Sequence, residues 1–187
     1  MADPIKLNTL RLTLRQWIMS DWSVFARLNA DPVVMKYFPA ILTETESHAM
    51  ADKIYALIEE RGWGLWAVEK KDNNQFIGFV GLHETLHELP FSPCVEIGWR
   101  LAREYWGLGY ATEAAKCALD YAFTQLDLRE IVSFTSVLNQ PSINVMQRLG
   151  MKNTGHYFSH PKLPADSRLQ KHCLYRLLRE EWLAVDV

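Results

Sequence analysis

Two glycines stand immediately before a long apolar-periodic segment. Gly107 and Gly109 lie in the stretch WGLGYAT (106–112), and the periodic segment continues to about Gln125. The first turn of a helix has backbone N–H groups without partners and a partial positive charge, so it binds anions such as phosphate. Glycine lets a phosphate approach the backbone because no Cβ is in the way. The stretch therefore predicts a diphosphate site on the N–H groups around 108–112; the alternative is a turn that merely leads into a helix.

Two common phosphate-binding patterns do not fit the residues around these glycines. A P-loop needs lysine and then serine or threonine after its last glycine, whereas Tyr110 and Ala111 follow Gly109. A Rossmann fingerprint needs a third small residue at the right spacing, an acidic residue about 20 positions later and repeated βαβ units. The match here is partial, and expected antiparallel hairpins precede it. The pattern therefore disfavours a dinucleotide-dependent oxidoreductase.

A second stretch, HETLH from His83 to His87, fits the H-E-x-x-H pattern of zinc proteases. Zinc binding by this pattern needs both histidines on one face of a helix. The stretch follows the apolar run FIGFVGL and leads into Pro90 and Pro93, which leaves room for little more than one helical turn. We therefore predict a loop and no metal site, and a zinc hydrolase is the minor alternative.

Periodicity and capping signals predict the elements that position these residues. Ser20 is expected to cap a helix that stops near Asp31-Pro32, after an alternating strand over 10–17. Thr43 and Glu46 form a capping-box pattern for a helix that Gly62 closes. Further strands are predicted over 63–71, 76–84, 94–102, 129–137, 151–160 and 171–180, and helices over about 109–125 and 140–149, the second with Gly150 behind it.

This order of elements predicts a single α/β domain over residues 1–187. The strands before and after the glycine-led helix form a βαβ unit, so they should be parallel with a right-handed crossover. The earlier strands are joined by short polar turns and should be antiparallel. The expected fold is a mixed, mostly antiparallel sheet with flanking helices.

Composition indicates an ordinary globular protein. Hydrophobic residues make up 49% and charged residues 22% of the chain, and the net charge is −2, so no basic excess points to nucleic acid. The three cysteines, an odd number and far apart, do not predict a disulfide framework. The first residues lack the apolar core of a signal peptide, and no apolar run approaches the ~20 residues of a membrane span. We expect a cytoplasmic protein without a membrane partner.

Over nearly its whole length the chain resembles the GNAT acetyltransferase superfamily, in its RimJ/RimL-like branch of amino-group acetyltransferases. The superfamily's diphosphate motif, [RQ]-x-x-G-x-[GA], is matched by WGLGYA from Trp106 to Ala111. Trp106 departs from the Arg or Gln of the first position, although YWGxGYATEA is typical of this branch. The resemblance also lies in LRLTLRQW, SDW, DPVVMKYFP, FIGFVGL, VEIGWRL, VLNQPSINVMQRLGM and the closing strand.

The resemblance implies a GNAT-like fold with a cofactor site. The strands VEIGWRL and REIVSFTSV would splay apart, with acetyl-CoA in the gap. The pantetheine arm would pair with the strand edge near Trp99 to Leu101, as an added strand does. The diphosphate would lie on the glycine turn, and no metal is expected. The implied cofactor-binding residues are Trp99, Arg100, Leu101, Trp106, Gly107, Leu108, Gly109, Tyr110, Ala111, Thr112, Asn139 and Ser142.

Acetyl transfer to an amine needs a group that removes a proton and one that protonates the leaving thiolate. Glu96 is the candidate base because the resemblance places a carboxylate of this strand on the substrate side; the alternative is a solvent-facing or salt-bridged glutamate. Many relatives place a tyrosine acid where this chain has Met146, which cannot donate a proton. In the RimL-like branch Ser142 would replace it, unless this hydroxyl only caps backbone groups. A water chain is the alternative base.

The predicted function is acetyl-CoA-dependent N-acetylation of a primary amine, either a peptide or protein N-terminus or a small amine. The loops 161–170 and HETLHELPFSP (83–93) are candidate walls of an acceptor groove, the second through His83, Glu84, His87 and Glu88. The main alternative is a non-catalytic acyl-CoA-binding regulatory module on the same fold. The protein would be a monomer or a homodimer.

Overall fold

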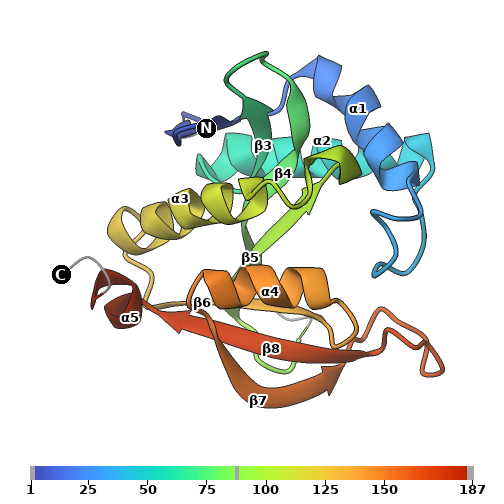
Figure 1. The fold of residues 1–187 in the computed structure, drawn as a ribbon, viewed down its shortest axis with the longest axis vertical. Helices are drawn as coiled ribbons and strands as arrows, with labels where there is room; N and C mark the ends of the chain where they lie inside the picture. The colour runs from blue at the N-terminus through green and yellow to red at the C-terminus, as the bar shows by residue number, and fades with distance from the viewer. Residues whose placement is uncertain (1–2, 87–88, 185–187) are drawn as a thin grey trace. The chain divides into compact units, whose positions relative to one another are not determined.

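The structure is a computed structural model that describes residues 3–86 and 89–184. The helices are α1 (Met19–Ala30), α2 (Glu44–Arg61), α3 (Tyr110–Thr124), α4 (Gln140–Arg148), α5 (Arg179–Leu183) and a 3-10 turn, η1 (Arg103–Tyr105) (Figure 1). The strands are β1 (Leu7–Asn8), β2 (Leu12–Arg15), β3 (Leu65–Lys70), β4 (Phe76–Thr85), β5 (Cys94–Leu101), β6 (Glu130–Ser136), β7 (Lys152–Ser159) and β8 (Lys171–Leu178).

The chain divides into two compact units, one up to Leu82 together with Gly98–Ala118, the other His83–Ile97 together with the chain from Leu119. In the first unit β1, β2, β3 and β4 follow one another in the sheet, and each pair is antiparallel. The predicted hairpin over 63–84 is therefore confirmed. The predicted strand over 10–17 is shorter than expected, because Leu10 lies in a bend and is 90% exposed.

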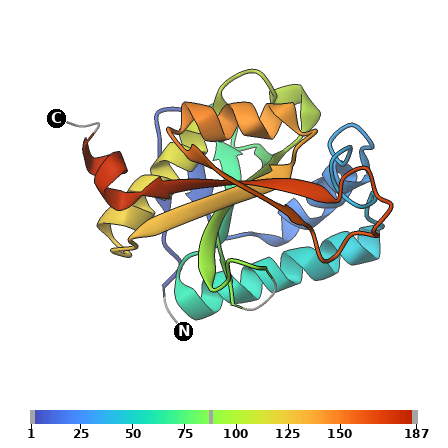
Figure 2. The same ribbon diagram turned by 90° about the horizontal axis from the view of Figure 1, so that it is seen from below.

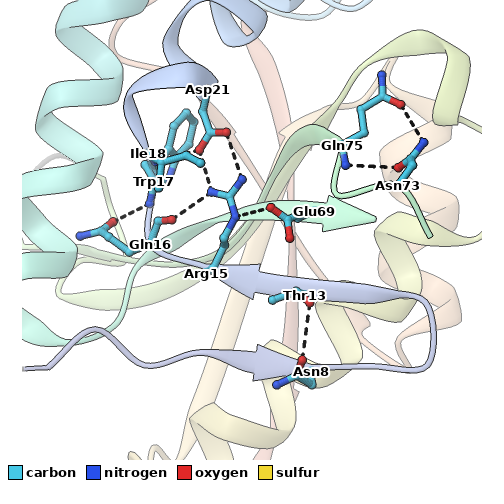
Figure 3. A network of polar contacts seen from close by, with 10 residues as sticks. All are labelled: Asn8, Thr13, Arg15, Gln16, Trp17, Ile18, Asp21, Glu69, Asn73 and Gln75. Atoms are coloured by element: carbon cyan, nitrogen blue, oxygen red, sulfur yellow. Dashed lines mark hydrogen bonds and ion pairs between the residues drawn. The ribbon is translucent and has the colours of Figure 1, made fainter. Parts of the chain in front are cut away.

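A partly buried ion-pair network joins β2, β3 and the start of α1 (Figure 3). Arg15 donates from Nε to Glu69 and from Nη1 to Asp21, each at 2.7 Å. The Asp21 carboxylate also accepts a hydrogen bond from the backbone N–H of Ile18 at 2.9 Å. This bond fixes the start of α1, so Ile18 is the N-cap residue and the prediction of Ser20 was wrong.

The long helix α2 has the ends that its capping pattern predicted. The Thr43 hydroxyl accepts from the Glu46 N–H, and the Glu46 carboxylate accepts from the Thr43 N–H. Gly62 ends the helix with φ 82°, a left-handed conformation that glycine adopts without cost. Ala51, Ile54 and Ile58 are the apolar side chains that α2 buries.

Gly78 allows β4 and the end of β5 to approach closely within the first unit. Its φ is +137°, and a Cβ there would lie 2.1 Å from the carbonyl oxygen of Arg100. Ala102 donates its N–H to the carbonyl of Ile77 at 2.9 Å beside it. Glycine is therefore required where the backbone of Arg100 passes β4.

In the second unit β5 pairs with β6 in parallel, and the order continues through β8 to β7 with antiparallel pairs (Figure 2). The parallel pair has Glu96 opposite Val132, and the Ser133 hydroxyl donates to the carbonyl of Ile97 at 3.0 Å. Strand β5, helix α3 and strand β6 thus form the predicted parallel βαβ unit. The fold class is confirmed: an α/β fold with a mixed, mostly antiparallel sheet and one parallel pair.

Two predicted boundaries were wrong. Strand β8 ends at Leu178, where the sequence pattern predicted extension to Glu180, because Leu178 donates its N–H to the Glu181 carboxylate at 3.0 Å and so caps α5. His83 and Glu84, predicted both as the end of the strand over 76–84 and as the start of a loop, lie in strand β4, which ends at Thr85. Within residues 3–86 and 89–184, no helix combines the length and apolarity that a membrane crossing requires.

Candidate active site

The glycine turn before α3 has the backbone conformation that its sequence predicted. Gly107 and Gly109 adopt φ values of 73° and 82°, in the left-handed region that favours glycine. The first helical hydrogen bond runs from the Glu113 N–H to the Gly109 carbonyl at 3.0 Å. The N–H groups of residues 110–112 therefore have no acceptor within the helix, and they form the positive end of its dipole. This end can hold a phosphate group.

Residues far away in the sequence hold this turn in place. The Glu113 carboxylate accepts hydrogen bonds from the Thr9 hydroxyl at 2.6 Å and from the Arg11 backbone N–H at 2.9 Å. The Arg11 guanidinium donates to the same carboxylate at 2.7 Å and to the Leu108 carbonyl at 3.0 Å, and it lies 4.4 Å from the Tyr110 ring centre. Sequence reasoning missed this clamp of Thr9, Arg11 and Glu113.

The clamp makes Glu113 more acidic than an ordinary glutamate. Partial burial, the largest influence, favours the neutral acid, but the hydrogen bonds from Thr9 and Arg11 and the charge of Arg11 outweigh it, so the pKa of Glu113 is lowered. The ionised carboxylate is thus neutralised by Arg11 beside the turn. A phosphate at the helix start would otherwise meet an unpaired negative charge in the first turn of α3.

The remaining predicted residues of the first unit lie at the end of β5 and in the turn itself. The Trp106 indole donates to the Leu101 carbonyl at 2.8 Å, which ties the turn to the end of β5. The Trp106 and Leu108 side chains are 42% and 52% exposed, whereas Leu101 is buried. Trp99 is half-buried, and the Arg100 side chain is buried among α1, α2 and β4.

In the second unit the structure brings Asn139 and Ser142 together at the start of α4. The Asn139 amide donates to the Thr135 hydroxyl at 2.9 Å and to the Ser142 hydroxyl at 3.1 Å, and its oxygen accepts from the Ser142 N–H at 3.3 Å. The bond to Thr135 places α4 on one face of β6 (Figure 1). Met146 is fully buried, so the position of the usual tyrosine belongs to the core.

Glu96 lies on the opposite face of the sheet from α4. It pairs with Val132, and paired residues of neighbouring strands point to the same side, whereas Thr135, three residues along β6, points to the other. The Glu96 side chain is half-buried. Burial, with the negative charges of Glu96 and Glu130, raises the pKa of the nearby Cys94 to about 11. The predicted base and the predicted acid, Ser142, are thus on opposite faces of this sheet.

An aromatic cluster shares the face of Glu96. Phe134 is two residues after Val132 on β6, and its ring lies 5.7 Å from Phe158. The other rings of the cluster are Phe91, 5.1 Å from Phe158, and His160 and His172, 4.8 Å from each other. Burial lowers the pKa of His172, against the opposing effect of its contact with the Gln170 carbonyl. The cluster joins the segment before β5 to the segment after β7.

The zinc pattern has the wrong backbone for a zinc site. His83 and Glu84 are in strand β4, so the helical spacing that H-E-x-x-H needs is absent at the start of the pattern. His87 and Glu88 lie outside the described residues. No group of three or more histidine, cysteine, aspartate or glutamate side chains within residues 3–86 and 89–184 is arranged to hold a metal ion.

The fold is that of an acetyltransferase, and similarity to known proteins supports this class. The sequence profile of the acetyltransferase (GNAT) domain matches residues 11–152. The uncharacterized N-acetyltransferase YnaD of Bacillus subtilis is 30% identical over 94% of this chain and 98% of its own length. The chain belongs to the GNAT acetyltransferase family, and it is an N-acetyltransferase.

Two further similarities extend this comparison. The FsC-acetyl coenzyme A-N(2)-transacetylase of Aspergillus fumigatus is 29% identical over 95% of this chain and 77% of its own length. The crystal structure of a GNAT-family acetyltransferase from Bacillus anthracis matches with a TM-score of 0.79 and 28% identity, and covers 95% of this chain and 100% of the other. These relatives confirm the family across almost the whole chain.

Proposed function

We propose that this N-acetyltransferase uses acetyl-CoA to acetylate a primary amine at the N-terminus of a peptide or protein, as in the RimJ/RimL-like branch. The observation that carries the proposal is the turn of Gly107 and Gly109, whose left-handed backbone exposes the N–H groups that begin α3. Members of the GNAT family use acetyl-CoA, and the residues of the turn fit its diphosphate. Trp99 to Leu101, Trp106 to Thr112, Asn139 and Ser142 are the proposed binding residues.

Acetyl-CoA supplies the acetyl group as a thioester and leaves as the free thiol. Glu96 accepts the proton of the attacking ammonium group, directly or through water, so that the nitrogen lone pair is available. Ser142 donates its proton to the sulfur as the C–S bond breaks, and it recovers one, through water, from the nitrogen, which loses its second proton as the amide forms. Asn139 donates to the Ser142 oxygen and so orients the hydroxyl. Glu96 and Ser142 lie on opposite faces of the sheet. This arrangement suits an amine that attacks from one face and a thiol that leaves toward the other.

An α-amine is the easier acceptor for a single carboxylate base. Its pKa is about 8, so an appreciable fraction is neutral at pH 7, whereas lysine, with a pKa of about 10.4, has roughly one neutral molecule in a thousand. The aromatic cluster around Phe158 supports an acceptor groove, because it joins Phe91 of the loop 83–93 to His160, the residue before the loop 161–170. The second candidate acceptor is a small amine enclosed by the same loops.

The test is an acceptor panel with acetyl-CoA, followed by thiol release and mass spectrometry. The panel contains short peptides with free and with blocked N-termini, polyamines and aminoglycosides. Acetylation of the free peptides alone supports the proposal. Acetylation of the small amines alone overturns the acceptor and keeps the enzyme class. Acetyl-CoA binding without turnover of any amine favours the non-catalytic acyl-CoA-binding module.

The proposal retains three expectations from the sequence. The chain forms one domain over residues 1–187, works in the cytoplasm, and is a monomer or a homodimer. Chromatographic mass determination of the purified protein, with and without acetyl-CoA, distinguishes the two oligomeric states.

A further inference from the structure

Arg100 carries a buried positive charge without an acidic partner. The residue is 8% exposed, and among the described residues no carboxylate lies within ion-pair distance. Its two hydrogen bonds both come from Nη1, one to the Asn29 amide oxygen at 2.7 Å and a weak one to the Met50 sulfur at 3.9 Å. The Nε atom is shielded from solvent and has no acceptor in the part of the chain that the structure describes.

Aromatic rings contact the guanidinium, with Phe38 at 4.1 Å and Phe79 at 5.4 Å from ring centre to Cζ. A ring attracts a cation through its face, whereas a guanidinium donates its hydrogen bonds within its own plane. The rings therefore do not provide the hydrogen-bond acceptor that Nε lacks. The edge formed by Nε and Nη2 has the fork geometry that binds both oxygens of a carboxylate.

Arg15, in the same unit, is a half-buried arginine that has acidic partners. It is paired with Asp21 and Glu69, and these two carboxylates raise its pKa even though burial, the largest influence, acts in the opposite direction. Arg100 has only burial, which lowers its pKa to about 10. It is still charged at neutral pH, so the unbound protein contains a cation that an incoming anion would neutralise.

A purely structural role accounts for only part of this arrangement. Asn29 is fully buried and donates to the Ser47 hydroxyl at 3.3 Å, so a polar chain runs from Arg100 through α1 to α2. These hydrogen bonds orient the Asn29 amide oxygen toward the guanidinium. A neutral amide and a hydroxyl do not compensate a full charge, and an uncharged side chain of similar length would join the helices at a lower desolvation cost.

We propose that the Arg100 guanidinium binds a carboxylate of the acceptor, which is therefore an amine that also carries a carboxylate group, such as a short peptide, and not a polyamine. The inference rests on the proposed function. Arg100 follows the proposed base Glu96 by four residues on β5, and an even spacing along a strand puts both side chains on the same side. Because Nε is shielded, binding requires the side chains around the guanidinium to shift.

The experiment compares matched acceptors with and without the carboxylate. Dipeptides that begin with glycine, alanine or serine are each paired with their C-terminal amides, and spermidine is added. Rates are measured at about pH 9, where both α-amines are largely neutral. The variants are Arg100→Met, Arg100→Lys and, as a control, Arg27→Met, which changes an exposed arginine on α1. The quantity compared is the ratio of kcat/KM for each peptide to that for its amide.

The wild-type ratio is expected to be roughly tenfold to hundredfold, as for a hydrogen-bonded charged pair. It should fall to near one in Arg100→Met, stay intermediate in Arg100→Lys and be unchanged in Arg27→Met. A purely structural role would lower both rates together and leave the ratio unchanged. Acetylation with a wild-type ratio near one overturns the inference but keeps the proposed function.

A binding measurement decides the question without turnover. The Nε–H signal of Arg100, assigned by its loss in Arg100→Lys, should shift on titration with propionate and not with propionamide. If no amine is acetylated, the proposed function fails, and this titration still tests the carboxylate site. If Arg100→Met does not fold, the wild-type protein and Arg100→Lys provide the same comparison. An Arg100 signal that does not respond to propionate overturns the inference.

Discussion

Adding a Cβ to the glycine turn should weaken acetyl-CoA binding beyond the backbone strain that it causes. Gly107 and Gly150 form a matched pair, because both are exposed and adopt φ values of 73° and 78°, and a Cβ at either would meet nothing within 4 Å. Alanine in this conformation costs about 1–2 kcal/mol. For a chain of this size, 1 kcal/mol changes Tm by about 2–4 °C. Gly107→Ala and Gly150→Ala should therefore each lower the Tm of the free protein by about 2–8 °C.

Only Gly107→Ala should also reduce the stabilisation by acetyl-CoA. A ligand at 100 times its Kd stabilises the native state by about 2.7 kcal/mol, or about 5–11 °C here. If the added Cβ weakens binding by about 30-fold, the same acetyl-CoA concentration stabilises by only about 0.9 kcal/mol, or about 2–4 °C. Gly150→Ala should keep the wild-type shift, because it ends α4 and is no part of the turn.

Thermal denaturation with and without acetyl-CoA provides the measurement. Pantetheine, which lacks the diphosphate, is the control ligand, and its effect should be the same in the wild type and in Gly107→Ala. The reasoning is refuted if Gly107→Ala keeps the full acetyl-CoA shift. It is also refuted if Gly150→Ala loses as much of the shift as Gly107→Ala does, since strain alone would then explain the loss.

Local signals predicted the elements that depend on neighbouring residues. Thr43, Glu46 and Gly62 determined both ends of α2, and the glycine turn determined the start of α3, because all the groups involved lie within a few residues of each other. The prediction of Ser20 as the N-cap of α1 was wrong because of another local contact. The Asp21 carboxylate, in the first turn of α1, accepts a hydrogen bond from the N–H of Ile18, the residue before the helix, and so places the N-cap at Ile18.

The contacts that shape the site could not be predicted because they join residues far apart in the sequence. Arg11 and Glu113 are 102 residues apart, and Arg100 and Asn29 are 71 apart. Neither pair has a spacing that periodicity or a motif detects, since only the pairing of strands and the packing of α1 bring them together. The loop prediction for HETLH was wrong for His83 and Glu84, because β4 continues to Thr85, whereas the strand predicted over 76–84 was right to within one residue.

Three further outcomes test the chemistry and the clamp. Glu96→Gln should lower kcat and flatten the acidic limb of the pH–rate profile while the acetyl-CoA Tm shift is kept; wild-type rate and pH dependence would exclude Glu96 as the base. Ser142→Ala should slow turnover more modestly, by roughly tenfold or less, since a thiolate is a fair leaving group; unchanged single-turnover rates would leave Ser142 only its structural bond to Asn139. The third concerns Glu113, whose pKa is lowered on folding, so its contribution to the free energy of unfolding is complete above its ordinary pKa of 4.5 and is lost as the pH falls through the lower folded value. Urea denaturation from pH 7 to pH 3 should therefore show a steeper acidic loss for the wild type than for Glu113→Gln, which has no carboxylate to protonate. Parallel curves would mean that the bonds from Thr9 and Arg11 do not distinguish the ionised from the neutral group, and that the turn is held by the helix start alone.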